Sequence, residues 1–129
     1  MHHRRDADRR TGRLAEQHRV DAVVHFAALK AVGESCLQPL QYFDNNISGT
    51  ISLLQAMRKA DIGRFVFSSS ATVYGDTDKV PIPENAPRSA TSPYARSKVI
   101  IEDMLLDVCA AYSDFNSAIL RYFNPVGAH

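Results

Sequence analysis

Cysteine is scarce in this sequence, and long hydrophobic runs are absent. The two cysteines, Cys36 and Cys109, lie in apolar stretches without the spacing of a disulfide framework or a metal site. No apolar run approaches the roughly 20 residues that span a membrane, and no signal peptide is recognisable. These absences exclude a disulfide-rich secreted scaffold and an integral membrane protein. They predict a cytoplasmic protein without a metal.

Excess charge of either sign is also lacking. Fifteen Lys and Arg residues oppose 14 Asp and Glu residues, so the formal net charge is +1 and no nucleic acid or membrane partner is indicated. The exception is a cluster of arginines near the N-terminus: Arg4, Arg5, Arg9, Arg10 and Arg13. A nucleic-acid arm is one interpretation, but the cluster has no aromatic residues to stack on bases. We expect residues 1–19 to be a poorly ordered basic terminus with the remnant of a helix.

Hydrophobic patterning predicts strands and helices in alternation. Three apolar segments are expected to be strands: residues 22–28, 64–69 and 117–123. Two longer segments carry apolar residues at helical spacing and are expected to be helices: residues 40–60 and 93–112. The first strand segment is apolar throughout, which is typical of a strand buried on both faces of a parallel sheet.

Proline, serine and glycine residues mark the ends of both predicted helices. Pro39 precedes the first helix and Gly63 ends it, while Ser92 caps the second helix and Pro93 begins it. The resulting order, β-α-β-α-β, corresponds to a right-handed parallel unit. The fold class is therefore α/β, as half of a doubly wound parallel sheet.

The glycines of this chain are too widely spaced to form the nucleotide-binding turn of a complete sheet of this class. In a Rossmann fold, a Gly-x-x-Gly-x-x-Gly-type turn joins the first strand to a helix and brings backbone N–H groups to the pyrophosphate. The six glycines never form this pattern: Gly12, Gly33, Gly49, Gly63, Gly75 and Gly127. We therefore expect residues 20–129 to be a partial Rossmann-like domain that lacks the N-terminal glycine-rich βαβ unit.

Ser70, Tyr94 and Lys98 form the most informative group in the sequence. Tyr94 and Lys98 are four residues apart at the start of a predicted helix, so they share one face. A nearby ammonium lowers the pKa of a phenol, which otherwise titrates at about pH 10, and makes it a usable base. Ser70 follows a strand at the edge where parallel α/β sheets bind ligands, and it can offer a second hydroxyl. The group indicates a redox-type proton relay with these three residues as catalytic candidates.

Each of these residues also has an interpretation without chemistry. A Tyr-x-x-x-Lys pair on a helix is commonly a weak surface pair, and a serine run after a strand is commonly a loop or a helix cap. His25 and His129 are interpreted as structural residues, because no partner spacing supports a metal site.

Longer strings around this group carry a family resemblance. They are Leu-Lys-Ala-Val-Gly-Glu-Ser at 29–35, Asp-Asn-Asn at 44–46, Ser-Ser-Ser-Ala-Thr-Val-Tyr-Gly at 68–75 and Arg-Tyr-Phe-Asn-Pro-Val-Gly-Ala-His at 121–129. On these strings the chain resembles the extended short-chain dehydrogenase/reductase family. The first and last strings are similar to those of its UDP-hexose 4-epimerases. The similarity covers residues 20–129.

The resemblance implies an NAD-dependent isomerase that interconverts UDP-glucose and UDP-galactose in galactose metabolism. Tyr94 would take the proton from the sugar 4-hydroxyl, Lys98 would hold the nicotinamide ribose and depress the Tyr94 pKa, and Ser70 would hydrogen-bond the reacting oxygen. Hydride would leave C4 of the sugar for NAD and return to the other face. The resemblance also implies cofactor contacts at Phe26, Ala27, Ala28, Lys30, Asn45, Tyr94, Lys98 and Phe123, and substrate contacts at Ser70, Tyr94 and Asn124.

Several of these contacts have structural alternatives. Phe26 and Phe123 are large enough to be ordinary core residues. Asn45 could hydrogen-bond locally within its helix, and Lys30 could be a solvated loop cation. These alternatives remain open from the sequence.

The chain departs from the family pattern in what it lacks. The glycine-rich turn, the acidic residue expected to hold the adenosine ribose, and the C-terminal substrate domain are not found, so we expect a chain truncated at both ends with little activity alone. One alternative is another nucleotide-sugar enzyme, such as a 4,6-dehydratase or a decarboxylase. Dehydratases would carry Thr-Asp-Glu where this chain has Ser-Ala-Thr at 70–72. Another is a non-catalytic fragment that dimerises through helices 40–60 and 93–112, as the family does.

Overall fold

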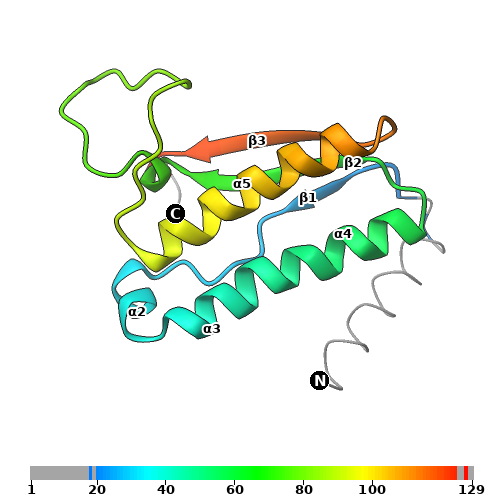
Figure 1. Ribbon diagram of the computed structural model, residues 1–129, viewed down its shortest axis with the longest axis horizontal. Coiled ribbons are helices and arrows are strands. Elements are labelled where there is room, and N and C mark those ends of the chain that lie inside the picture. The colour runs from blue at the N-terminus through cyan, green and yellow to red at the C-terminus, as the bar shows by residue number, and fades with distance from the viewer. Residues whose placement is uncertain (1–17, 19, 125–126, 128–129) are drawn as a thin grey trace.

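The computed structural model describes residues 18, 20–124 and 127, and the predictions for the basic N-terminus and for His129 lie outside these residues. Three parallel strands form one sheet in chain order: β1 (Val23–His25), β2 (Arg64–Ser70) and β3 (Asn116–Tyr122). The carboxyl ends of the strands therefore lie at one edge of the sheet (Figure 1). The predicted parallel β-α-β-α-β order is confirmed.

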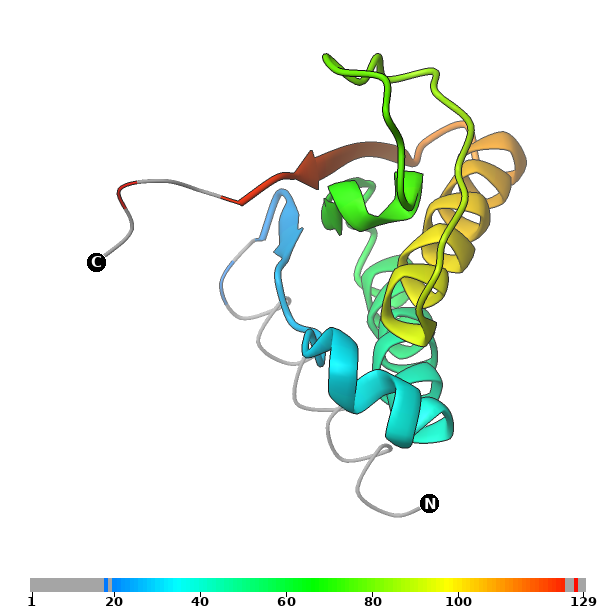
Figure 2. The same cartoon turned by 90° about the vertical axis from the view of Figure 1, so that its left-hand side faces the viewer.

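Helical segments connect the strands. They are α2 (Val32–Leu37), α3 (Pro39–Phe43), the π-helical turn η1 (Asp44–Ser48), α4 (Gly49–Lys59), the 3₁₀ turn η2 (Ala71–Tyr74) and α5 (Pro93–Ala111). The long helices α4 and α5 both lie on the same face of the sheet (Figure 2). The predicted capping of α5 is confirmed, since the Ser92 side chain accepts a hydrogen bond from the Ala95 N–H and Pro93 begins the helix.

The hydrophobic core lies between that face of the sheet and the two long helices. Phe65 and Phe67 are two residues apart in β2, so both point toward the helices, as the period-2 pattern of a strand requires. Helix residues complete the core: Leu54, Met57, Ile101 and Leu105. Val24 and Leu120, on the opposite face of the sheet, are exposed in the described part of the chain. The prediction that the strand at 22–28 is buried on both faces is therefore wrong for these residues.

The predicted helix at 40–60 is interrupted by a π-helical turn. Pro39 begins α3 as expected, but η1 separates it from α4, and the short helix α2 was not predicted. π-turns carry one extra residue and occur often at functional sites. Asn46, near the middle of this turn, is buried.

Gly63 does not end the helix, contrary to the prediction. Ala60 is the C-terminal cap of α4, and the residue with positive φ that follows is Asp61 (φ 53°). Gly63 instead allows a close approach of two backbones, because a Cβ atom there would lie 2.1 Å from the Asp114 carbonyl oxygen. The glycine is required for packing beside β3 rather than for turning the chain.

Candidate active site

The predicted site residues gather where the strands end. Residues 26–30 follow β1, Ser70 ends β2, and residues 123–124 follow β3. Phe26 and Phe123 are 65% and 58% exposed, so neither belongs to the core of the described structure. Exposed aromatic rings at the carboxyl edge of a parallel sheet are placed as ligand contacts would be.

Tyr94 and Lys98 lie together in the first turns of α5, as the spacing predicts. The Lys98 ammonium nitrogen is 5.8 Å from the centre of the Tyr94 ring and 4.7 Å from that of Phe67. Lys98 Nζ donates a 2.8 Å hydrogen bond to the Ser68 carbonyl, and the Ser35 hydroxyl oxygen accepts from the Tyr94 N–H. The pair is therefore held between β2 and α2 rather than free in solvent.

Burial changes the acidity of Lys98. The residue is 3% exposed, and the loss of hydration lowers its pKa from 10.5 to about 8. At neutral pH the ammonium is still mainly charged, so a buried cation lies beside the Tyr94 ring. A surface pair would not show this burial, which argues against the interpretation of Tyr94 and Lys98 as a solvated pair.

Ser70 lies on a separate part of the same edge. Its Oγ accepts hydrogen bonds from the backbone N–H of Thr72 (3.2 Å) and from the Thr72 hydroxyl (2.9 Å), so it caps η2. The Ser70 proton is thereby left for another acceptor. Among the described residues no hydrogen bond joins Ser70 to Tyr94 or Lys98. Ser70, Phe123 and Asn124 instead line one cavity of about 450 Å³.

Asn46 was not predicted, yet it connects several parts of the site. Its side chain accepts from the Leu29 N–H (2.9 Å) and donates to the Leu29 carbonyl (3.0 Å) and to the Ser97 hydroxyl (3.2 Å). It thus fixes the loop at 26–30 to the turn of α5 that precedes Lys98. The predicted cofactor contact Asn45 is exposed and donates to the Asn46 side chain. Two adjacent asparagines were visible in the sequence, but which one is buried depends on the π-helical turn.

His25 occupies a structural position. Its ring packs near Phe65 and Phe67, and its Nε2 lies 3.2 Å from the Thr50 hydroxyl. Burial, with a smaller effect of the nearby Lys98 charge, lowers the pKa of His25 and favours the neutral ring. Within residues 18, 20–124 and 127, no group of His, Cys, Asp or Glu side chains is arranged to hold a metal ion.

A second buried group, centred on Glu102 of α5, was also not predicted from the sequence. The Glu102 carboxylate is 1% exposed and accepts hydrogen bonds from Ser69 (2.6 Å) and from Arg121 (3.0 and 2.7 Å). Burial by itself would raise the pKa of Glu102, but the hydrogen bonds from Arg121 and Ser69 and the charge of Arg88 outweigh it and lower the pKa. The carboxylate is therefore charged and fully paired inside the protein.

Comparison with known proteins decides the family. Residues 4–129 match the NAD dependent epimerase/dehydratase family. The chain belongs to this family. This membership confirms the resemblance seen in the sequence. In the described part of the chain, no helix is long and apolar enough to cross a membrane.

Its similar relatives within the epimerase/dehydratase family carry one name. The chain is 54% identical over 116 residues to the UDP-glucose 4-epimerase of Dictyostelium discoideum and 56% identical over 113 residues to that of Yersinia pestis. It covers 34% and 33% of those proteins, which in turn match 90% and 87% of this chain. The chain therefore spans about a third of the length of the curated relatives it matches.

Solved structures show the same relationship. A UDP-glucose-4-epimerase from Stenotrophomonas maltophila, with bound NAD and formylated UDP-arabinopyranose, superimposes with a TM-score of 0.91 at 55% identity. The enzyme from Bifidobacterium longum, in complex with NAD+ and UDP, gives 0.89 at 46% identity. Each match covers 95% of this chain and 36% or 37% of the other. The sheet, helices and loops described above thus occur in larger epimerases.

Proposed function

We propose that this chain is the catalytic segment of a UDP-glucose 4-epimerase, an NAD-dependent isomerase that interconverts UDP-glucose and UDP-galactose in galactose metabolism. The observation that carries the proposal is the buried Lys98 beside Tyr94 at the carboxyl edge of the sheet. The identity of more than half of the aligned residues to enzymes of that name supports the same substrate class.

The residues present fit the nicotinamide end of NAD. Lys98 offers a cation with three donors, of which the Ser68 carbonyl takes one, and suits a ribose diol. Phe26, after β1, and Phe123, after β3, offer exposed apolar surface to the cofactor. The remaining cofactor contacts would come from Ala27, Ala28, Lys30 and Asn45. When bound, NAD supplies the chemistry of hydride acceptance from C4 of the sugar and hydride return. The sequence contains no glycine-rich turn to hold the pyrophosphate.

The protein side chains would handle the proton and orient the sugar. Tyr94 would take the proton of the sugar 4-hydroxyl, with the Lys98 ammonium nitrogen 5.8 Å from the centre of its ring. Ser70 donates its free proton to the same oxygen, and Asn124, exposed at the cavity next to Ser70, contacts the UDP-hexose. Tyr94, Ser70 and Asn124 would thus act on the bound sugar nucleotide from the positions that they occupy in this structure.

A chimera tests this function directly. Residues 20–124 would replace the matching segment of the Dictyostelium discoideum enzyme, and conversion of UDP-galactose to UDP-glucose would be followed with NAD present. We expect an active enzyme that Tyr94→Phe slows by about 10²–10⁴-fold. Tyr112→Phe, an exposed tyrosine at the end of α5, is the matched control and should leave the rate unchanged. A folded, NAD-binding chimera that epimerises neither sugar would refute the proposal.

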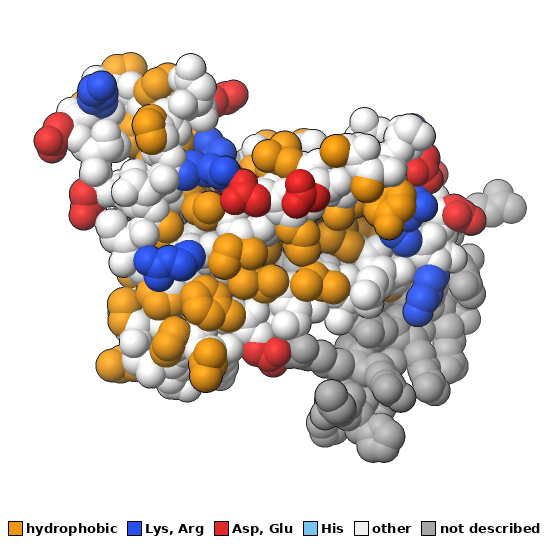
Figure 3. Space-filling model, in the orientation of Figure 1, with side chains coloured by type: hydrophobic (Ala, Val, Ile, Leu, Met, Phe, Trp, Pro, Cys, Tyr) orange, Lys and Arg blue, Asp and Glu red, His pale blue; other side chains and the backbone are white. Residues whose placement is uncertain are grey.

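A homodimer formed through the two long helical segments is the proposed assembly. Hydrophobic side chains gather over α3, α4 and α5 on the face shown in Figure 3. Both segments carry exposed hydrophobic residues: Leu40 and Ile51 on the first, and Ile100 and Leu106 on the second. An apolar surface of this kind is typical of a subunit interface, and it is also the observation that favours a non-catalytic, dimerising fragment as the second candidate.

A further inference from the structure

We propose that Glu102 is a positioning residue of the sugar-nucleotide site, acting through two arginines that hold the loop at residues 75–92. The inference rests on the proposed function for its ligand, but its structural part stands on the contacts of Glu102 alone. The carboxylate lies behind the carboxyl edge of the sheet and touches none of the predicted catalytic residues. Glu102 would act indirectly, through the two arginines and the loop that they hold in place.

Strand register brings the first two partners of Glu102 together. Ser69 of β2 is paired with Arg121 of β3, and both side chains point toward α5, where they bond the carboxylate. Ser70 and Tyr122 form the next register pair and point to the opposite face, as the alternation of a strand requires. Glu102 therefore fixes the strand ends one residue before Ser70 and two residues before Phe123.

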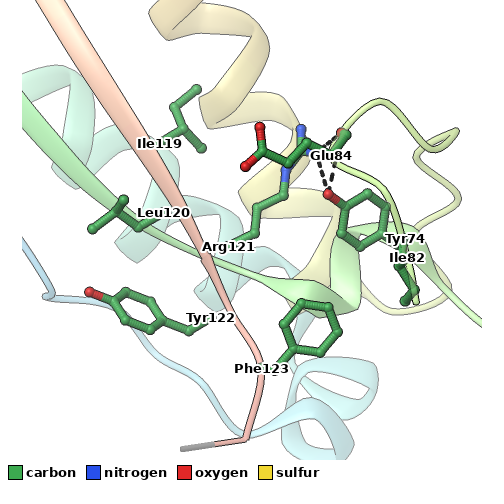
Figure 4. Close-up of a pocket in the computed structure, with 8 residues that line it drawn as sticks. All are labelled: Tyr74, Ile82, Glu84, Ile119, Leu120, Arg121, Tyr122 and Phe123. Carbon is green, nitrogen blue, oxygen red and sulfur yellow. Dashed lines mark hydrogen bonds between the residues drawn. The ribbon is translucent and has the colours of Figure 1, made fainter. Parts of the chain in front are cut away.

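Arg121 extends the connection into the loop. Its Nη1 donates to the Tyr74 hydroxyl (2.7 Å) and to the Glu84 carbonyl (2.8 Å), and Figure 4 shows these bonds among residues that line a cavity beside β3. Hydrogen bonding to Glu102 raises the pKa of Arg121 further above its ordinary value, so the guanidinium is permanently charged. One side chain thus joins α5, β3, η2 and the loop.

Arg88 supplies a second connection from within the loop. It pairs with Glu102 Oε2 at 3.3 Å and with the exposed carboxylate of Asp103. The backbone adds few further ties, among them the bond from the Ser89 N–H to the Val73 carbonyl and the bond from the Ala86 N–H to the Pro83 carbonyl. Glu102 therefore receives two of the charged side chains that hold this loop, while Arg96 of α5 donates to the Ala90 carbonyl (3.5 Å).

The position of the loop matters because it forms one side of the cavity that Ser70 lines. Asp76, Asp78 and Ile82 of the loop line this cavity together with Ser70 and Asn124. The loop also joins the segment that follows Ser70 to the helix that carries Tyr94. A shift of the loop would change both the shape of the cavity and the placement of Ser70 relative to Tyr94.

A buried ion pair is a costly way to gain stability alone. An apolar replacement of similar volume is often as stable, whereas charged hydrogen bonds of fixed geometry specify one arrangement of the groups they join. The single carboxylate that pairs with Arg121 and Arg88 suits that second role. The geometry thus assigns Glu102 to holding the loop, rather than to filling the core.

Hydrogen exchange of the 129-residue chain tests the proposal. Glu102→Gln keeps the volume of the side chain and removes its charge. We expect the amides of Ala86 and Ser89, which are hydrogen-bonded within or next to the loop, to exchange about tenfold faster. Amides in the first halves of β2 and β3, away from Ser69 and Arg121, should keep their rates. A purely structural role would instead raise exchange uniformly through the strands.

A second variant keeps the test decisive if Glu102→Gln does not fold. Arg88→Gln leaves the pair between Arg121 and Glu102 intact and should loosen only the loop. Arg58→Gln is the control for loss of an arginine–carboxylate pair elsewhere, because Arg58 pairs with the exposed Asp114 at the C-terminal end of α4. Unchanged loop exchange in Arg88→Gln, or equal loosening in Arg58→Gln, would overturn the proposal.

UDP-glucose separates this inference from the proposed function. In the chimera, UDP-glucose should slow loop exchange, and Arg88→Gln should raise the KM for UDP-glucose severalfold with a smaller change in kcat. If Arg88→Gln loosens the loop but UDP-glucose neither protects it nor reacts, the positioning of the loop is supported and the proposed substrate is refuted. If UDP-glucose reacts and the KM is unchanged, the role of Glu102 in the site is refuted.

Discussion

Given NAD and UDP-galactose, the 129-residue chain by itself is expected to form UDP-glucose at least about 10⁵-fold more slowly than an intact relative. Hydride transfer requires the nicotinamide and the sugar C4 to be held in a reactive arrangement, and such positioning is worth an effective molarity of about 10⁵–10⁸ M. The chain carries the proposed proton-transfer residues, but its six glycines form no turn that binds a pyrophosphate. Without both reactants in place, Tyr94 and Lys98 have no bound sugar to act on.

The measurement is a coupled assay for UDP-glucose on the purified chain, with the chimera as the positive control. A cooperative thermal transition and sedimentation as a dimer would show that inactivity is not caused by unfolding. The same data test the proposed helical interface. Turnover within tenfold of an intact enzyme would contradict the argument, because positioning would then not depend on the missing turn.

Replacing Lys98 with methionine is expected to stabilise the fold at neutral pH, even though Lys98 is proposed to be essential. Burial lowers the pKa of Lys98 from 10.5 to about 8, so at pH 7 the folded state carries an ammonium that the unfolded state hydrates better. Each pKa unit corresponds to about 1.4 kcal/mol, which makes the penalty about 3 kcal/mol. Lys98→Met removes this penalty and loses a hydrogen bond to Ser68 worth about 1 kcal/mol. The net expectation is a gain of about 2 kcal/mol in the free energy of unfolding.

The sign of the effect with pH follows from proton binding. Between about pH 8 and 10.5 the unfolded chain binds the Lys98 proton more fully than the folded chain, so the stability of the wild type rises with pH in that window. The advantage of Lys98→Met should therefore shrink above pH 8 and vanish by about pH 10. Urea unfolding at several pH values measures it, with the exposed residue in Lys59→Met as the control. A variant less stable than the wild type at pH 7 would show that burial does not penalise Lys98.

Much of the fold could be predicted because local signals agree with tertiary structure. The run around Phe65 and Phe67 has strand character, and the Ser92–Pro93 cap begins a helix whose apolar stripe packs on the sheet. Tyr94 and Lys98 were recognisable because helical spacing alone puts them on one face. These features depend on a few neighbouring residues, so sequence patterns are sufficient.

The groups that hold the site together could not be predicted in this way. Asn46 and Glu102 are polar residues within helices, and their pattern is the same as that of solvated positions. Their burial depends on partners 17 to 51 residues away for Asn46 and 14 to 33 residues away for Glu102. The predicted role of Gly63 was wrong for the same reason. The Asp114 carbonyl that lies close to it in space is far from it in the sequence.

The π-helical turn at Asp44–Ser48 also sets a limit on how this segment can change. The wider turn absorbs one extra residue, so α3 and α4 keep a common buried side, with Tyr42 before the turn and Leu54 and Met57 after it. A one-residue insertion or deletion within the regular part of α4 is not absorbed in this way and would rotate the residues beyond it by about 100°. A change of length in this segment is therefore accommodated at the turn, whereas within α4 it would move the buried face of the helix into solvent.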